Sequence, residues 1–244
     1  MRFLNISFLK NYVHRFTLLT TVFLVISGCS LDEIETQDFT LGSSYYPLSP
    51  YRHIDYRVLQ IRYSLFQGND TSQFFLREAV VDTFRDVTGE LNFRIERFKR
   101  STEEAEWVID SIWSARVNQT RIIKEENGTS FVKMALPEEE RKSWNGNAFN
   151  TLGDDFYSII NFKDTFATGN FEFFPTLEVE QANFSSAVNR DVRREVYAEG
   201  IGLVYLFNQR LQFINDPNDP NFGLDSITDG FFFEYQYVDH QLGE

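Results

Sequence analysis

The stretch LNFRIERFKR, residues 91–100, decides the fold class predicted for this chain of 244 residues. Its first apolar residues, Leu91, Phe93 and Ile95, alternate with polar residues, and this period of two places the apolar side chains on one face of a β-strand. A glycine-containing turn sequence joins the stretch to a similar run over residues 73–87. We therefore predict a β-hairpin that buries one of its faces.

Comparable runs of β-branched and aromatic residues follow one another along most of the chain. We predict strands over residues 51–66, 73–87, 91–100, 115–125, 130–136, 155–162, 171–181, 193–207 and 231–238. The run over residues 193–207 is expected to fold back near Ala198-Glu199-Gly200. Asn127-Gly128 predicts a tight hairpin turn, because this pair suits the backbone of two-residue β-turns. Residues 103–113 fit either a short helix or the start of a strand, with the strand preferred. Residues 189–202 could begin as a helix, although two glycines would keep it short.

These runs predict a mostly β fold, with a single antiparallel β domain over residues 45–244 and few or short helices. Its architecture is either a sandwich or a sheet curved into a half-open barrel. The 26 phenylalanines indicate a large aromatic core or an aromatic-lined groove. On the last predicted strand, Phe231, Phe233, Tyr235 and Tyr237 share one face, which fits either a core or a platform for a carbohydrate or a lipid.

The N-terminus carries the features of a bacterial lipoprotein leader. Three basic residues and no acidic ones precede Cys29, and the apolar stretch over residues 18–26 is too short for a transmembrane helix. The run VISGC, residues 25–29, resembles a lipobox, in which the cysteine becomes the lipidated first residue of the mature protein. We predict a signal peptide over residues 1–28 and a membrane anchor through the lipid on Cys29. The alternative is an ordinary secretory signal with a chance cysteine.

Residues 29–44 are expected to form an acidic tether, because they lack apolar periodicity. The start of this tether, SLDEIE over residues 30–35, resembles the acidic export signal of surface lipoproteins in Bacteroidota. The predicted location is the outer membrane, with the cell surface slightly favoured over the periplasmic face. Removal of residues 1–28 leaves 20 basic and 36 acidic residues, a net charge of −16. Such a charge repels phosphate backbones and argues against nucleic-acid binding.

Several later segments together resemble an uncharacterised family of Bacteroidota lipoproteins. They are YYPL (45–48), EAVVDTF (78–84), FVKMALP (131–137), SWNGNAFN (143–150) and EVYAEGIGLVY (195–205). The resemblance covers most of residues 45–214, and WNGN and YAEGIG are its most specific parts. It implies an envelope location and a β-rich fold, but it assigns no activity and no catalytic residue.

The sequence carries none of the common catalytic motifs. Only His53 and His240 remain after cleavage of the leader, and no second cysteine accompanies Cys29, so we expect neither a zinc site nor a Ser-His-Asp set. A Gly-x-Ser-x-Gly motif and a phosphate-binding glycine loop are both missing. We predict a protein without catalytic residues. A glycosidase-like pair of carboxylates stays open as an alternative, because acidic residues are abundant.

The loop around Trp144, Asn145 and Asn147 is the main candidate for ligand binding. An aromatic ring beside amide groups can stack on a sugar and hydrogen-bond its hydroxyls. The alternative is structural: Trp144 fills the end of a sheet, and the Asn-Gly pair forms the turn beside it.

A second loop is a candidate for a cation. Asp216, Asn218, Asp219 and Asp225 supply oxygen ligands of the kind that calcium prefers, although the EF-hand spacing is absent. The alternative is a surface turn stiffened by proline. No other cofactor is predicted.

These features favour a lipid-anchored envelope protein that acts as a non-enzymatic binding or assembly module, with an unknown protein or glycan partner. Two alternatives are kept. The first is a carrier whose curved aromatic sheet holds a lipid or a lipoprotein. The second is a protein that binds or acts on carbohydrate.

The lipid anchor predicts a simple change of location. Cys29→Ala should remove the acylation site, so that the chain leaves the detergent-soluble membrane fraction and is recovered in the aqueous fraction. Metabolic labelling with an alkyne fatty acid, followed by membrane fractionation, measures both effects. Ser30→Ala is the matched control. A Cys29→Ala protein that still incorporates the label would contradict lipidation at this residue.

Overall fold

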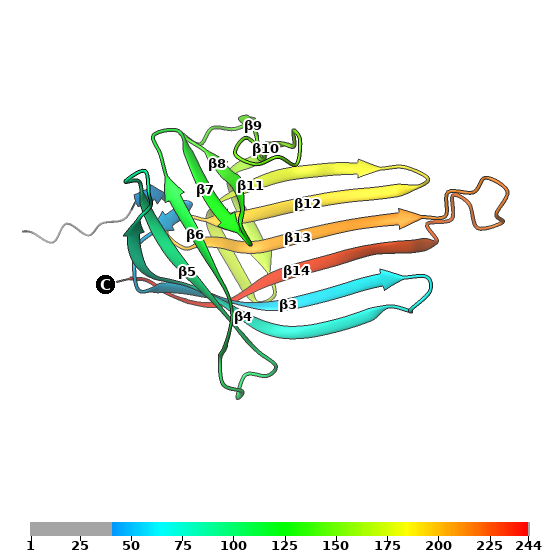
Figure 1. The fold of residues 1–244 in the computed structure, drawn as a ribbon, viewed down its shortest axis with the longest axis horizontal. Helices are drawn as coiled ribbons and strands as arrows, with labels where there is room; N and C mark the ends of the chain where they lie inside the picture. Colours follow the sequence, from blue (N-terminus) through cyan, green and yellow to red (C-terminus); the bar gives the residue numbers. More distant parts are fainter. Residues whose placement is uncertain (1–40, 244) are drawn as a thin grey trace, which may run out of the picture. The chain divides into compact units, whose positions relative to one another are not determined.

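A computed structural model describes residues 41–243, and every regular element in this part of the chain is a β-strand (Figure 1). The strands are β1 (Leu41–Ser43), β2 (Tyr46–Leu48), β3 (Arg52–Ser64), β4 (Asp70–Arg85), β5 (Leu91–Arg100), β6 (Val108–Val117), β7 (Arg121–Glu126), β8 (Thr129–Ala135), β9 (Ser143–Asn145), β10 (Phe156–Thr168), β11 (Phe171–Ser185), β12 (Asn189–Ala198), β13 (Gly202–Phe213) and β14 (Ile227–Gln241). Residues 41–243 contain no helix that could span a membrane. The predicted signal peptide and Cys29 lie outside the described residues.

Twelve of these strands form one antiparallel sheet, and β1 and β2 form a separate hairpin. The order in the large sheet is β8-β7-β6-β5-β4-β3-β14-β13-β12-β11-β10-β9. Consecutive strands therefore pair from β3 to β8 and from β9 to β14. The pairing of β14 with β3 joins these two halves, and β8 and β9 are the two edges of the sheet. The sheet curves until it is nearly closed (Figure 1). This confirms the mostly β prediction and, of the two predicted architectures, the curved half-open barrel.

The two edges of the sheet meet along a short seam between β8 and β9. The Val132 amide donates to the Gly146 carbonyl at 2.8 Å, and the Trp144 indole N–H donates to the Val132 carbonyl at 2.9 Å. The Asn150 side chain donates to the Ser130 carbonyl at 2.9 Å. These few bonds replace the continuous ladder of a closed barrel, so the seam is the weakest join around the sheet.

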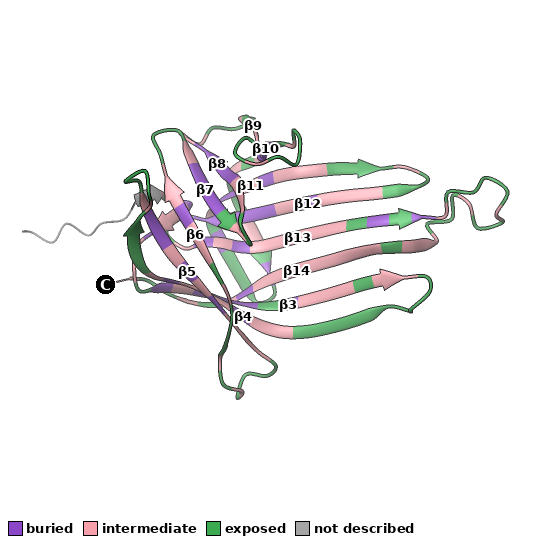
Figure 2. Cartoon of the chain, in the orientation of Figure 1, coloured by how far each residue is buried: buried purple, intermediate pink, exposed green. Residues whose placement is uncertain are grey.

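The inner face of the sheet forms a core at one end. Phe93 and Ile95 of β5 are buried, as their alternation predicts, and Leu48 of the β1–β2 hairpin packs against them. Figure 2 shows buried segments gathered near β5–β8, whereas the far ends of β3, β12 and β14 are intermediate or exposed. The far end of β13 keeps two buried residues, Leu211 and Phe213. The sheet is thus filled at one end by the β1–β2 hairpin and extends past its own core at the other.

The end of the β10–β11 hairpin packs on neighbouring strands through aromatic rings. The Phe166 ring lies 5.2 Å from that of Tyr205, and the rings of Phe171 and Phe173 lie 4.8 and 5.1 Å from that of Tyr237. Three register shifts along β10 bend this hairpin toward those contacts. The Tyr237 end of the aromatic face predicted on residues 231–238 therefore belongs to the core.

One predicted segment at the N-terminal side differs from the structure. Residues 41–44 were expected to belong to the tether, but Leu41–Ser43 form β1. The Ser43 hydroxyl accepts bonds from the amides of Tyr45 and Tyr46 at 3.1 and 3.0 Å, which fixes the turn into β2. Local side-chain chemistry, rather than apolar periodicity, makes this hairpin.

Other boundaries changed because tertiary pairing overrides local preference. The helix considered over residues 189–202 is wrong, since β12 forms ladders with both β11 and β13. Residues 103–113 hold the start of β6, in agreement with the preferred strand. The strand expected over residues 115–125 is two strands, β6 and β7, separated by residues 118–120. The Asn127-Gly128 hairpin is confirmed.

Gly146 provides a stability test of the seam. A Cβ at this position would overlap the ring of Tyr157, so Gly146→Ala should lower the free energy of unfolding by about 3 kcal/mol. Gly153→Ala is the matched control in the same loop, because a Cβ there meets open space and only a positive φ is strained, at about 1 kcal/mol. Urea denaturation measures both, and equal losses would contradict the tight packing at Gly146.

Candidate functional site

A cavity of about 670 Å³ lies on the inner face of the curved sheet. Its volume is in the range of sites that hold small-molecule ligands, roughly 300–1,000 Å³. Tyr46 and Leu48 of the β1–β2 hairpin line one end, and Gln60, Asn208 and Arg210 line it where β3 and β13 run outward. The cavity therefore has a filled end and an end that continues onto the exposed part of the sheet.

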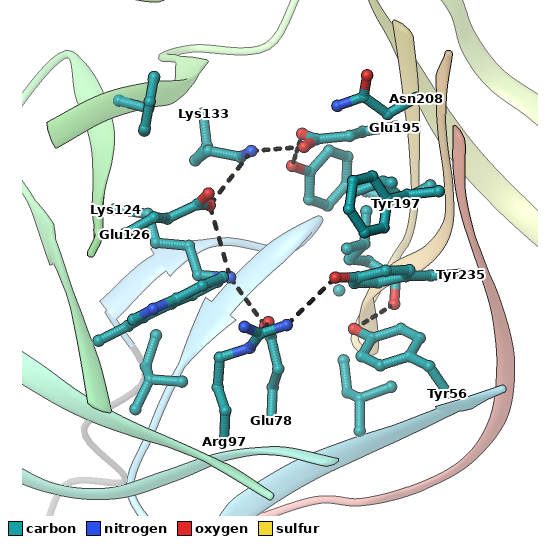
Figure 3. A pocket seen from close by; sticks show the side chains of 18 of the residues that line it. Tyr56, Glu78, Arg97, Lys124, Glu126, Lys133, Glu195, Tyr197, Asn208 and Tyr235 are labelled. Atoms are coloured by element: carbon teal, nitrogen blue, oxygen red, sulfur yellow. Dashed lines mark hydrogen bonds and ion pairs between the residues drawn. The ribbon is translucent and has the colours of Figure 1, made fainter. Parts of the chain in front are cut away.

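Six of the charged side chains that line this cavity form a connected group, which we call the charged cluster. They are Glu78 of β4, Arg97 of β5, Lys124 and Glu126 of β7, Lys133 of β8 and Glu195 of β12. They come from positions where the pattern of a β-strand would place core residues, and they converge from opposite walls (Figure 3). Lys133 is the unpaired residue of a bulge between Val132 and Met134, which turns its side chain inward.

Glu78 is held by two cations from neighbouring strands. Its Oε1 accepts a bond from Arg97 Nε at 3.0 Å, and its Oε2 accepts one from Lys124 Nζ at 2.8 Å. All three side chains are at most 14 % exposed. Both oxygens of this carboxylate are thus occupied in a low-dielectric setting, where charge-assisted bonds are strong.

Glu195 is held in the same way from the far wall. Its two oxygens accept hydrogen bonds from Lys133 Nζ and from the hydroxyl of Tyr197. Glu126 lies between the two lysines, with Oε1 at 3.6 Å from Lys133 Nζ and 4.0 Å from Lys124 Nζ. Glu126 makes only these long charge contacts among the described residues, so its carboxylate keeps its hydrogen-bonding capacity.

Arg97 extends the cluster toward an aromatic side chain and a second ion pair. Its Nη2 donates to the Tyr235 hydroxyl at 3.2 Å, and its guanidinium carbon lies 3.7 Å from the ring centroid of Trp113. Asp110 is 3.7 Å from Arg97 Nη1 and accepts a closer contact, at 2.8 Å, from Lys99. The stacking and the ion pairs fix the plane of the guanidinium.

The surroundings of Glu78 and Lys133 shift the pKa of each group so that its charged form is favoured. Burial raises the pKa of Glu78, but the charges of Lys124 and Arg97 outweigh burial, and the pKa falls below its ordinary value of 4.5. Its stabilising charge is therefore present above pH 4.5 and is lost as the pH falls further. Burial lowers the pKa of Lys133, but Glu195 and Glu126 raise it well above the ordinary value.

The outer part of the cavity has polar atoms without partners. Asn208 Oδ1 and Arg194 Nε are buried, and neither has a hydrogen-bond partner among the described residues. Phe233 lies beside them on the cavity wall, and its ring is 5.4 Å from that of Phe231. Unfilled buried polar groups beside an aromatic surface are typical of a site whose ligand completes the hydrogen bonds.

The three residues of the predicted WNGN site lie at the seam, and none of them lines the cavity. Trp144 is 7 % exposed and bonds to Val132, and the Asn147 side chain is buried. Asn145 donates to Asp154 at 2.7 Å and accepts from the Asn147 amide at 2.9 Å. These contacts correspond to the structural alternative, in which the loop closes the end of the sheet.

In the predicted calcium loop, two carboxylates accept hydrogen bonds from backbone amides and so stabilise local turns. Asp216 accepts from the amide of Asn218 at 2.9 Å, and Asp219 accepts from that of Asn221 at 2.8 Å. Asp225 instead bonds to Arg190, at 3.0 Å. No group of three or more His, Cys, Asp or Glu within residues 41–243 could hold a metal ion. The loop matches the proline-stiffened turn more closely than a cation site.

The sequence prediction missed the charged cluster as a site, although part of it was visible. Glu78, Lys133 and Glu195 each fall within a segment that carries the family resemblance. A usable signal is a lysine or glutamate at an inward position of a predicted strand, where an apolar residue is expected. The sequence did identify Phe233 and Tyr235 as sharing a face, and both line the cavity.

The described residues thus define a mostly β protein whose single curved antiparallel sheet encloses a polar cavity. The sequence matches no protein-family model and no curated protein. Among solved structures it is similar to a crystal structure from Bacteroides fragilis described as a "putative exported protein with YmcC-like fold". The two share 8 % identity with a TM-score of 0.42, over 81 % of this chain and 100 % of that chain, a likeness too distant to carry an argument.

The ion pair between Lys133 and Glu195 gives a stability prediction. Lys133→Met leaves the Glu195 carboxylate buried without a cation, which should cost about 3–5 kcal/mol, whereas the double variant Lys133→Met/Glu195→Gln should recover most of that loss. Urea denaturation measures both variants.

Arg94→Met is the control for this ion pair, because Arg94 and Asp82 are about half exposed and their pair should contribute less than about 1 kcal/mol. A loss for Lys133→Met no larger than that for Arg94→Met would show that the buried pair is not coupled to folding.

Proposed function

We propose that this protein is a lipid-anchored envelope protein that binds a polar ligand in the cavity of its curved sheet and does not transform it. The observation that carries the proposal is the charged cluster around a cavity of about 670 Å³. The anchor is Cys29, and the location is the outer membrane, as the leader and the family resemblance predict.

The energetics of buried charge support a binding role. Each ion moved out of water loses several kcal/mol of hydration, and well-packed apolar residues in place of a buried ion pair are often as stable or more so. Apolar residues do fill the neighbouring core around Phe93 and Leu177. Six charged residues at inward positions beside that core are therefore better explained by a ligand than by stability.

The same geometry favours binding over hydrolysis. A glycosidase needs one carboxylic acid with a raised pKa as well as a second carboxylate. Lys124 and Arg97 lower the pKa of Glu78, and both oxygens of Glu195 are occupied by Lys133 and Tyr197. The competing proposal of a carbohydrate-acting enzyme rests on three glutamates in one cavity, and it would be favoured by turnover of a bound ligand.

The lipid-carrier alternative fits less well. An acyl chain in this cavity would lie against the charged cluster, and it could not use the hydrogen-bonding capacity of Glu126 or Asn208. Phe74, Phe131 and Phe233 add apolar surface to the lining of the cavity. They suit the apolar side of a polar ligand, such as the face of a sugar ring.

Blocking the cavity tests the proposed function. Asn208→Phe places a ring in the outer cavity and should abolish ligand binding while the protein stays folded. Gln209→Phe is the matched control, because neighbouring residues of a strand point to opposite faces. Differential scanning fluorimetry against panels of sugars, polar metabolites and phospholipids, followed by calorimetry, measures binding.

The outcomes of this test separate the alternatives. Loss of binding of a polar compound in Asn208→Phe alone supports the proposal. Binding only of phospholipid would favour the carrier, and conversion of the bound compound, seen by mass spectrometry, would favour the enzyme. A polar ligand that binds Asn208→Phe and Gln209→Phe equally well would show that the cavity is not its binding site.

A further inference from the structure

The hydrogen bonds of the charged cluster leave the lysines with spare donors, and Glu126 is the only carboxylate of the cluster whose oxygens accept no hydrogen bond from the described residues. Both oxygens of Glu78 and both of Glu195 already accept bonds from side chains. Lys124 and Lys133 each make one such bond, although an ammonium group has three N–H donors. A bound molecule therefore meets mainly unused N–H groups at the centre of the cavity, and acceptor-rich ligands match them best.

The charge of the lining has the opposite sign to that of the chain. Eight Lys or Arg and four Asp or Glu line the cavity, whereas the whole chain has a net charge of −13. Carboxylates outside the lining face three of these cations. Asp155 and Asp191 pair with Arg193, and Glu178 and Asp191 lie 3.7 Å from Arg194 and Arg210, respectively. Arg52 is 6 % exposed and donates to the carbonyls of Gly200 and Ile201, with no carboxylate partner among residues 41–243. Low-dielectric walls concentrate the field of such charges inside the cavity.

Glu126 is the weak member of the cluster. Its contacts with Lys133 and Lys124, at 3.6 and 4.0 Å, are longer than hydrogen bonds, and its side chain is 25 % exposed. It is the last residue of β7, next to the Asn127-Gly128 turn. An incoming anion can occupy the space between the two ammonium groups in place of this carboxylate.

We infer that the ligand of this cavity is an anion bearing a carboxylate or a phosphate, held between Lys124 and Lys133. This inference rests on the proposed function and specifies its ligand. Arg193 and Arg210 also line the cavity. The acidic exterior repels anions in bulk, so recognition depends on the cavity and not on the surface.

Matched probes test this inference. Trigalacturonate supplies carboxylates and mannose 6-phosphate supplies a phosphate, and galactotriose and mannose are their uncharged counterparts. At least one anionic probe should bind about tenfold tighter than its counterpart in calorimetry, and its affinity should fall as salt is raised. The probe that binds identifies the acidic group.

Two substitutions in the cluster should act in opposite directions on that anionic probe. Glu126→Gln removes the competing carboxylate and should tighten binding about fivefold. Lys124→Met removes a donor and should weaken binding about tenfold, while Glu78 keeps Arg97 as its partner and the fold is retained. Lys163→Met, on an exposed lysine outside the cavity, should change nothing. Thermal unfolding of each variant checks the fold.

The results separate this inference from the proposed function. Equal or tighter binding of the uncharged probes, together with weaker binding in Glu126→Gln, would overturn the anionic ligand and leave the cavity as a polar binding site. No binding of either anionic probe at millimolar concentration would also overturn it. The Asn208→Phe variant then tests whether the cavity binds a ligand at all. A polar ligand that binds this variant as tightly as it binds the unsubstituted protein would contradict both the anionic ligand and the proposed function.

Discussion

The interaction between Lys133 and Glu195 joins two walls of the curved sheet across its interior. Lys133 reaches inward only because a bulge interrupts β8, and Glu195 comes from β12, on the other side of the seam. The pair is buried, so each charge needs the other to offset its lost hydration. This ion pair therefore fixes the position of β8 relative to β12, in addition to the few hydrogen bonds at the seam. The cavity between the two strands keeps its shape as a result.

The charged cluster and the apolar core divide the inner face between them. The β1–β2 hairpin fills one end with Tyr45 and Leu48, so that end needs no ligand. Beyond it, charges replace apolar side chains and the interior stays open. Polar groups that face one another across open space attract water or a ligand, whereas apolar groups would draw the walls together. The same sheet thus supplies both a core and a site.

How much of the fold and the site could be predicted from the sequence depends on the information in an alternation of apolar and polar residues. It predicts which residues face inward, and β5 spans the predicted residues 91–100, although the alternation covers only its first part. It does not predict which inward residues face one another, because that depends on curvature and on the bulge at Lys133. The WNGN loop shows the same limit: the Asn-Gly pair predicts a turn, but only the seam explains why Trp144 is buried.

The pairing of β14 with β3 has a consequence for how the chain matures. Val58 pairs with Tyr235, so the two halves of the sheet cannot join until almost all of the chain has left the ribosome. Contacts between such distant residues are slow to form, since a long loop must close first. Until then Glu78, of the first half, and Glu195, of the second, lie on unjoined pieces in water. The site is therefore assembled last, and a truncated chain has no cavity to fill.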